Sequence, residues 1–326
     1  MRSRTTVLLA VSLFALLGLA CSSTISEGNA TLPVGIESAR LPSNDLAGYI
    51  YFGADPPIGL ATERFGSALG GPPVLAEGPG SLRLSSATIA LSASIGEFGG
   101  TLEFASQDEA QFAWGLLQSK SDKDFWGQLD SAKVHIVRGE SPWASAVREQ
   151  IETGGLVSLK EYDPEIWTLL TNLPESADRP PMAVGVLTLD GDLIKDLASA
   201  EGIRLFGLEN IFGFVKVDSL VFGLYTDVPS TVPESLGREF LMEADASIFL
   251  VSDSGYPGFV VSFLLGTVGG RVGLETIDLG DAKARYRTLD DLHLVVKNRG
   301  SLVFAALAGT RAEAERLMLK IVEQAD

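Results

Sequence analysis

The second half of the chain contains a series of short apolar runs separated by turn residues, and this pattern constrains the fold most. The runs are LVFGLYTDV (220–228), ASIFLVSDSGYPGFVVSFLL (246–265), AKARYRTLDDLHLVV (282–296) and NRGSLVFAAL (298–307). Gly, Asp and Asn lie at their turns, so the runs predict successive antiparallel strands. The stretch GFVVSFLLGTV (Gly258–Val268) is eleven residues long. We expect it to be a buried strand, because it is too short to cross a bilayer.

Two glycine-rich segments predict hairpins. TIALSASIGEFGGTLEF (88–104) favours two strands that turn near Gly99 and Gly100. LGTVGGRVGLE (Leu265–Glu275) lacks the lysine and hydroxyl of a phosphate-binding loop, so we expect a bulged hairpin there.

Capping residues mark helix starts between the strands. A side-chain oxygen at the cap accepts hydrogen bonds from first-turn N–H groups, and proline suits the first helical position. The pairs are Ser106 with Glu109, Ser141 with Pro142, Asp163 with Pro164, and Thr310 with Glu313. After the last cap, one helical face is apolar: Ala314, Leu317, Met318, Ile321, Val322 and Ala325.

Two pairs of segments share a layout, which we interpret as a diverged internal duplication. In the first pair, strands that end near Phe52 and Leu189 both lead into aspartates that start a helix, at Asp55 and at Asp190-Gly191-Asp192. In the second pair, Leu-x-Phe-Ala at 102–105 and at 302–305 precedes a hydroxyl cap and a glutamate. Chance similarity between ordinary strand–helix units is the alternative.

The segment TNLPESADRPPM (171–182) is polar and holds three prolines, which is typical of a linker. It divides the mature chain into a first lobe, 43–170, and a second lobe, 183–326. We expect an α+β fold in which each of two related lobes is a mainly antiparallel sheet with helices packed on one face.

The N-terminus has the layout of an export signal. Arg2 and Arg4 precede sixteen uncharged residues, Thr5–Ala20, which is shorter than a membrane-spanning helix. A basic start, a short apolar run and small residues at its end predict a secretory signal peptide.

LLGLAC (Leu16–Cys21) resembles the lipobox of bacterial lipoproteins, which signal peptidase II cleaves. Leu19 and Ala20 match the pattern, whereas Gly18 stands where leucine is usual. The resemblance implies a signal peptide at 1–20 and a diacylglyceryl thioether on Cys21, often with a further acyl chain such as palmitate. Residues 21–42 would form a flexible tether. An unlipidated signal peptide and an uncleaved anchor helix are the alternatives.

From that resemblance we expect the protein in the bacterial cell envelope. Its lipid anchor would lie on the outer side of the cytoplasmic membrane, or in the outer membrane of a cell that has one. LPSNDLAGYIYF (Leu41–Phe52) together with the later strand–helix units also resembles an uncharacterised family of extracytoplasmic bacterial proteins, which implies no activity.

The charge balance limits the partners. With 42 acidic and 25 basic residues, the formal net charge is −17, so we expect repulsion from nucleic acid and from anionic surfaces. The single cysteine excludes an internal disulfide. The expected membrane contact is therefore the lipidated Cys21 itself, and any protein or small-molecule partner stays open.

The sequence offers few catalytic groups. Patterns of the HExxH, P-loop, GxGxxG, GxSxG and SxxK types do not occur. The two histidines, His135 and His293, lie in expected strands, where a position facing solvent or a lobe interface is the simpler interpretation. Lipidation would remove Cys21 from catalysis. We therefore expect no catalytic, cofactor-binding or metal-binding residue.

Two acidic clusters have structural interpretations. LDGDLIKD (Leu189–Asp196) begins like a calcium loop but lacks the distal glutamate, so its aspartates are expected to cap a helix. EYDPEIW (Glu161–Trp167) is expected to be a helix start rather than a sugar site. The four tryptophans are expected in the core: Trp114, Trp126, Trp143 and Trp167.

Three functions follow from these features. The first is a membrane-anchored extracytoplasmic lipoprotein that acts without catalysis, by binding or scaffolding. The second is a carrier or sensor of an apolar ligand such as a lipid, which requires an apolar cavity of several hundred Å³ between sheet and helices. The third is a carboxylate-dependent hydrolase, which requires two acids that face each other across a cleft.

Overall fold

A computed structural model describes most of the chain from residue 32 onwards, which includes the last eleven residues of the expected tether, where η1 and β1 lie. The described residues are 32–53, 84–94, 97–120, 124–174, 181–188, 219–225, 246–271, 273–289 and 291–323. Cys21 lies outside these residues, as do Asp55 and the Asp190–Asp192 segment.

The first half of the chain supplies five strands of the main sheet and several short elements. They are η1 (Ile36–Ser38), β1 (Arg40–Leu41), β2 (Gly48–Phe52), β3 (Leu84–Leu91), β4 (Phe98–Phe104), α3 (Gln107–Lys120), β5 (Phe125–Asp130), β6 (Lys133–Arg138), α4 (Pro142–Thr153), β7 (Val157–Ser158), α5 (Leu159–Tyr162) and α6 (Pro164–Leu170).

The second half supplies seven strands and two helices within the described residues. They are β8 (Ala183–Thr188), β9 (Ser219–Tyr225), β10 (Ser247–Asp253), α10 (Gly258–Arg271), β11 (Glu275–Leu279), β12 (Ala282–Leu289), β13 (Leu292–Arg299), β14 (Leu302–Ala308) and α11 (Arg311–Glu323).

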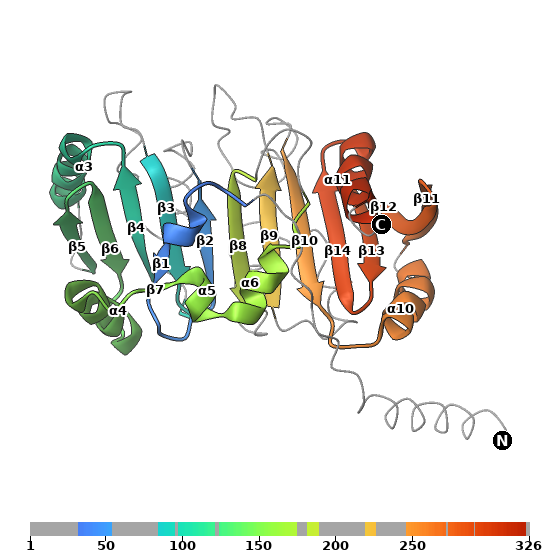
Figure 1. Cartoon of the computed structure of the whole chain (residues 1–326), viewed down its shortest axis with the longest axis horizontal. Coiled ribbons are helices and arrows are strands. Elements are labelled where there is room, and N and C mark those ends of the chain that lie inside the picture. The colour runs from blue at the N-terminus through green and yellow to red at the C-terminus, as the bar shows by residue number, and fades with distance from the viewer. Residues whose placement is uncertain are drawn as a thin grey trace, which may run out of the picture.

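All strands except β1 and β7 join one antiparallel sheet (Figure 1). The order of its 12 strands is β11-β12-β13-β14-β10-β9-β8-β2-β3-β4-β6-β5. Strands β2 and β8 pair with each other, so the two halves meet in the middle of one sheet. This architecture confirms the expected α+β class with mainly antiparallel strands.

The strand connectivity repeats about this central pair. In the first half, three adjacent strands (β2, β3, β4) lead through α3 to β5 and β6, and β6 returns to lie beside β4 before α4. In the second half, β8, β9 and β10 lead through α10, and β14 returns beside β10 before α11. The hairpin β11–β12 is the addition in the second half.

This connectivity agrees with one of the two sequence parallels and corrects the other. Strands β2 and β8, the first pair, occupy equivalent places. The second parallel matched β4–α3 with β14–α11, but by connectivity β4 corresponds to β10 and β14 corresponds to β6. The shared residues arise because a buried strand that leads into a capped helix commonly has apolar residues followed by a hydroxyl cap and a glutamate.

Helices cover both faces of the sheet. One face, called the α6 face, includes Tyr49, Val186, Val221, Val251 and Phe304 in one cross-strand row and is covered by α4, α5, α6 and α11. The opposite face, called the α3 face, packs against α3 and α10. Each half therefore has helices on both faces, where the sequence led us to expect one, because its central strands are apolar on both sides.

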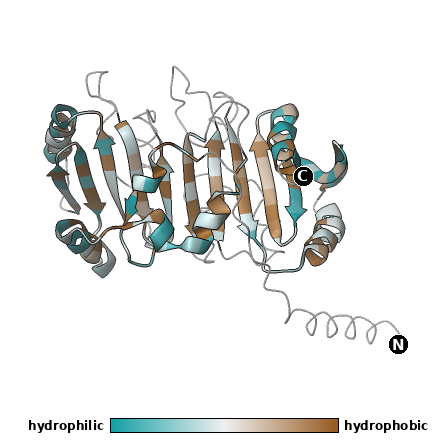
Figure 2. Ribbon diagram, viewed as in Figure 1, coloured by the Kyte–Doolittle hydropathy of each residue, from teal (hydrophilic) through white to brown (hydrophobic). Residues whose placement is uncertain are grey.

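The core lies along the middle of the sheet and under α11. Phe249 and Phe304 are fully buried there with ring centroids 6.1 Å apart. Leu317 and Met318 of α11 pack onto the same cluster, which confirms the predicted apolar stripe. Figure 2 shows mainly hydrophobic strands and a hydrophilic outer surface on α11.

The expected strand at Gly258–Val268 is wrong: this stretch forms α10. Val261 and Leu265, four residues apart, are buried on one helical side, whereas Phe259 and Phe263 are 60% and 65% exposed. A largely apolar run does not distinguish a strand from a helix, and here the packing of the run against β13 selected the helix. The expected bulged hairpin at Leu265–Glu275 is also wrong, since its first part continues α10 and Gly273 turns the chain into β11.

The first expected hairpin exists, but its turn lies earlier. Strands β3 and β4 pair antiparallel and are connected through residues 92–97, whereas Gly99 and Gly100 lie inside β4. A Cβ on Gly100 would lie 2.5 Å from the Thr88 carbonyl oxygen, so the neighbouring backbone requires a glycine there.

The capping predictions are confirmed where the structure describes the contacts. The Ser141 hydroxyl accepts a hydrogen bond from the Ala144 N–H, and Asp163 accepts from Glu165 and Ile166. The Glu109 and Glu313 N–H groups donate to the hydroxyls of Ser106 and Thr310, respectively.

Candidate functional site

The α6 face of the first half carries polar side chains in two adjacent cross-strand rows. The strand register aligns Ser86, Glu103, Lys133 and Asp130 in the first row. The second row contains Thr88, Thr101, His135 and Gln128. The third row, with Ala90, Gly99, Val137 and Trp126, has no charged residue. Polarity therefore changes along the strands at one end of the sheet.

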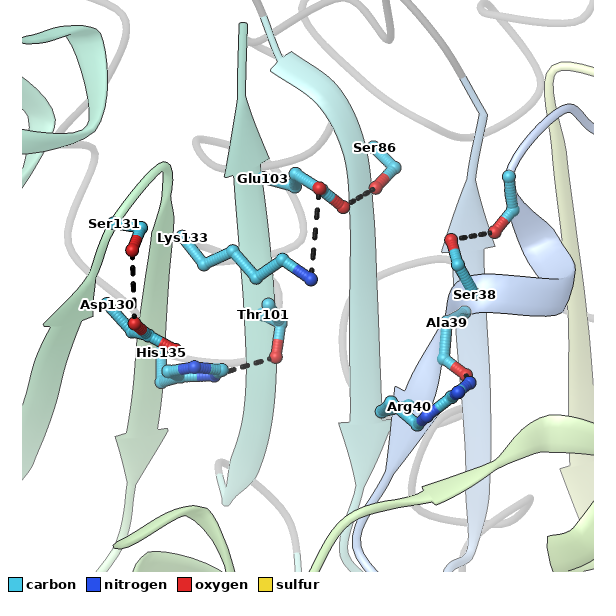
Figure 3. A network of polar contacts seen from close by, with 11 residues as sticks. Ser38, Ala39, Arg40, Ser86, Thr101, Glu103, Asp130, Ser131, Lys133 and His135 are labelled. Carbon is cyan, nitrogen blue, oxygen red and sulfur yellow. Dashed lines mark hydrogen bonds and ion pairs between the residues drawn. The ribbon is translucent and has the colours of Figure 1, made fainter. Parts of the chain in front are cut away.

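The first row is a line of alternating charges (Figure 3). The Lys133 ammonium lies 3.8 Å from the Glu103 carboxylate, and the Ser86 hydroxyl donates to the other carboxylate oxygen at 3.2 Å. Asp130 on β5 is the backbone register partner of Lys133 on β6. Lys133 therefore stands between two carboxylates, and the row carries one excess negative charge.

The second row contains a buried histidine. His135 is 8% exposed, and its Nδ1 lies 2.9 Å from the Thr101 hydroxyl. Burial lowers the pKa of His135, because the interior disfavours the imidazolium, although Asp130 acts in the opposite direction. The imidazole is therefore neutral at pH 7 and adds no charge to the site.

The third row is covered by α4, which sets one boundary of the open area. A Cβ on Gly99 would lie 2.8 Å from a methyl carbon of Val147, so the helix packs directly on the strand. Val137 and Val147 belong to the same small apolar cluster. The helix ends at Gly154, which has a φ of 72° and terminates the packing before the polar rows.

The segment before β2 forms the opposite wall. Leu41 is fully buried, and β1 pairs with β7, so Arg40 is held on the outer side of this short ladder. The Tyr51 hydroxyl donates to the Val34 carbonyl at 2.8 Å and ties this segment to the sheet. Burial raises the pKa of Tyr51 to about 12, so this hydroxyl stays protonated.

Together these elements enclose a pocket of about 270 Å³. Its floor is formed by the two polar rows, and its walls come from the segment around η1 and from the end of α4. The lining residues are Ser38, Ala39, Arg40, Ser86, Thr88, Thr101, Glu103, Asp130, Lys133, His135, Ile151, Gly154 and Leu156. The two acids and two bases among them balance, so the pocket suits a small polar ligand rather than a highly charged one.

Among the described residues no group of three or more His, Cys, Asp and Glu side chains could hold a metal ion. Within the same part of the chain, no helix is long and apolar enough to cross a membrane.

The structure places the sequence-derived candidates in different regions. His135 lines the pocket, whereas His293 lies on β13 in the other half, 2.7 Å from the Tyr286 hydroxyl. Asp163 caps α6, as expected for EYDPEIW, and Glu161 completes a capping box with Ser158, the N-cap residue of α5. Trp167 is buried in the core. Trp114 is partly buried against the cluster under α3, and Trp126 and Trp143 are partly buried against the cluster under α4.

Sequence reasoning considered only His135 among the polar lining residues and interpreted it as structural, so it predicted no site here. One signal was present, because polar residues alternate at Ser86-x-Thr88, Thr101-x-Glu103 and Lys133-x-His135. Alternation of this kind places both members of each pair on one face of a strand. It does not show that the three strands are neighbours, and this adjacency is what creates the site.

Neither a family model nor a curated protein matches the chain. Among solved structures, TP0453 in crystal form III is 10% identical, with a TM-score of 0.35 over 89% of this chain and 99% of that one. TP0453 in crystal form I is 8% identical, with a TM-score of 0.38 over the same shares. Likeness at this level carries no argument about the function of this chain.

Proposed function

We propose that this chain is a lipid-anchored extracytoplasmic protein that binds a small polar ligand without transforming it. The observation that carries the proposal is the pocket of about 270 Å³ on the α6 face, with its floor of hydroxyls and balanced charges. The lipobox-like LLGLAC supports anchoring in the bacterial envelope through Cys21.

The arrangement of acids favours binding over carboxylate-dependent hydrolysis. Glu103 and Asp130 both line the pocket, but they rise from the same sheet face with Lys133 between them. A hydrolytic pair holds its substrate between the two carboxylates. Two acids in one row of the same sheet face, with a lysine-bearing strand between them, stand side by side rather than facing each other across a cleft.

The lining of the pocket also favours a polar ligand over the apolar carrier alternative. Four hydroxyl-bearing and four charged residues line it, and an apolar ligand would desolvate them without compensation. The apolar side chains of the sheet are instead packed against helices in clusters.

Binding is tested by native mass spectrometry of the full chain, extracted from membranes in mild detergent. We expect a small polar molecule to be retained. The variant Thr101→Leu should release it, because the larger apolar side chain occupies the floor and removes the partner of His135. Thr267→Leu changes an exposed residue of α10 in the other half, so this matched control should retain the ligand. A ligand retained equally by both variants would contradict the pocket as its site.

Anchoring is tested separately. Cys21→Ser should move the protein from the membrane fraction to the soluble fraction, because a serine cannot carry the thioether. Mass spectrometry of the wild-type N-terminus should show a chain that begins at an acylated Cys21. An unmodified Cys21 would refute the anchor and leave the pocket proposal intact.

A further inference from the structure

We propose that helix α10 and the basic side chains beside it dock on the surface of a bilayer that contains anionic lipids. This inference goes beyond ligand binding, and it uses the expected anchor only to bring the protein close to the membrane. It follows from two observations on the α3 face of the second half: exposed phenylalanines on an uncharged helix, and cations around that helix.

The outer side of α10 is apolar. Residues 258–270 of this helix include no charged side chain. Phe259 and Phe263 lie about one helical turn apart, and both rings are exposed. The opposite side of the helix packs on the sheet through Val261 and Leu265. Two large rings exposed side by side on a helix are typical of a surface that contacts a partner or a membrane.

The other exposed hydrophobic side chains do not form a comparable surface. Among the described residues, the remaining large ones are Val34 and Phe112. Phe112 lies on α3, which covers the same sheet face, but Asp108 and Glu109 occupy the first turn of that helix. Anionic headgroups repel carboxylates, so α10 rather than α3 fits such a membrane.

Basic side chains lie beside α10 on the same sheet face. Lys283, Arg285 and Arg287 alternate along β12, so they share one side of that strand. This is the α3 side, because Arg285 is the register partner of Val296, which belongs to the cluster beneath α10. A Cβ on Gly266 would lie 3.3 Å from Nη2 of Arg285, so this guanidinium lies against the helix.

The positive charges around α10 are only partly offset. Arg271 adds an exposed cation in the last turn of the helix. Asp278 is the register partner of Lys283 and offsets one charge. The register partner of Arg285 is Thr276, whose hydroxyl accepts a hydrogen bond from Nη1 of that arginine. The α3 side of the β11–β12 hairpin, together with the end of α10, therefore carries excess positive charge.

A bilayer with anionic lipids fits both the apolar helix side and the cations. Phenylalanine rings enter the boundary between headgroups and acyl chains, while arginine and lysine reach the phosphates. The formal net charge of −17 predicts repulsion of the whole chain from such a surface. At physiological ionic strength, however, exposed charges more than about 8 Å away are largely screened, so the cations next to the contact decide.

The expected anchor supports the same occupant. Leu32, the first described residue, follows Cys21 by eleven residues, which span at most about 36–40 Å when extended. This reach exceeds the diameter of a small domain, about 30 Å, so the tether allows the α3 face to turn toward the bilayer. Because tethering makes docking intramolecular, a contact too weak to hold an unanchored chain on the membrane suffices.

The test locates α10 when the lipidated full chain is reconstituted in vesicles. Two exposed helical serines form a matched pair: Ser262→Cys places a fluorophore beside the phenylalanines of α10, and Ser145→Cys places it on α4, on the opposite sheet face. The thioether blocks Cys21, so the introduced thiol alone reacts. In vesicles of phosphatidylglycerol and phosphatidylcholine with a nitroxide high on the acyl chains, quenching at position 262 should be at least about twofold stronger than at position 145.

Further variants assign the contact within the Ser262→Cys protein. Phe259→Ser combined with Phe263→Ser should lower the quenching to the level of the α4 site. Phe112→Ser, on α3, is the matched control and should leave it unchanged. Arg271→Gln combined with Lys283→Gln should lower the quenching in the mixed vesicles, as should replacing phosphatidylglycerol by phosphatidylcholine.

Three outcomes would overturn the inference. Equal quenching at the two labelled sites would show that α10 does not face the bilayer. Equal quenching at position 262 with and without phosphatidylglycerol would remove the role of anionic lipids. Energy transfer between labelled copies, without quenching by the lipid nitroxide, would show that α10 docks on a second copy instead. The mass of the N-terminus tests the anchor independently, so failure of the anchor and failure of this contact are distinguishable.

Discussion

The two halves of the sheet share a connectivity but use the same face differently. In the first half, β6 presents Lys133 and His135 on the α6 face, and a pocket lies over them. In the second half, β14 occupies the equivalent place and presents Phe304 and Ala306, which α11 covers. One backbone arrangement therefore supports an open polar pocket in one half and a closed core in the other.

The two halves differ because their covering helices pack on different cross-strand rows of the α6 face. Helix α4 contacts the apolar row at Gly99 and Val137 and leaves the polar rows open. Helix α11 contacts β10, β13 and β14 through buried Leu317 and Met318. Desolvating a row of charges would be costly, so the helix packs where the strand side chains are apolar.

The largest expected effect is the loss of the core in the second half. Phe304→Ala should lower the free energy of unfolding by about 3–5 kcal/mol, because a fully buried ring leaves a cavity. Urea denaturation measures this. Phe263→Ala is the control: its ring is 65% exposed on α10, and the change should stay within about 0.5 kcal/mol. Equal effects of the two variants would contradict the difference in burial.

The next largest effect concerns the packing of α4 on the sheet of the first half. Gly99→Ala should destabilise the protein by about 1–3 kcal/mol, because its Cβ would lie 2.8 Å from a Val147 methyl carbon and push α4 away. Gly115 lies in helix α3, and a Cβ added there would have no neighbour within 4 Å. Gly115→Ala should therefore raise the free energy of unfolding by about 0.5–1 kcal/mol, because alanine favours the helix over glycine. Thermal denaturation compares the two variants, and a Gly99→Ala variant as stable as the wild type or more stable would show that α4 does not pack tightly on the strand.

The two covering helices begin with comparable caps, which gives a smaller effect. Ser141→Ala and Thr310→Ala should each cost about 0.5–2 kcal/mol. The Ser141 change should cost more, because its hydroxyl also donates to Glu97 Oε2 at 2.5 Å. Chemical denaturation of both variants measures the order, and a larger loss for Thr310→Ala would reverse this part of the comparison.

The smallest effect is a pH dependence that belongs to the first half. Burial lowers the pKa of folded His135, so the unfolded chain takes up this proton first as the pH falls below the ordinary value of 6.5. The stability contribution is fully present above that value and declines on acidification. His135→Asn should lose less stability than the wild type between about pH 7.5 and about pH 5.5. Parallel urea titrations of the two proteins at both pH values measure this, and equal losses would exclude His135 as a source.

Local sequence signals predicted much of the fold. The hydroxyl caps at Ser141 and Thr310 and the Asp163 cap stand where expected, because capping depends only on neighbouring residues. The apolar stripe of α11 was also predictable from the sequence, since its apolar residues recur with the period of a helix. The stretch that forms α10 was misread, because its apolar residues have no clear period and only its packing against β13 determined its conformation.

By itself, the sequence determined the α+β class, the antiparallel strands and the helix starts, since these follow from propensities and side-chain hydrogen bonds within a few residues. It also supplied the expectation of a lipid anchor at Cys21, which lies outside the described residues. The tertiary structure alone decided that β3, β4, β6 and β5 are neighbours and that their polar residues share one register. Strand order depends on contacts between residues far apart in the chain, so the pocket exists only once the sheet has formed.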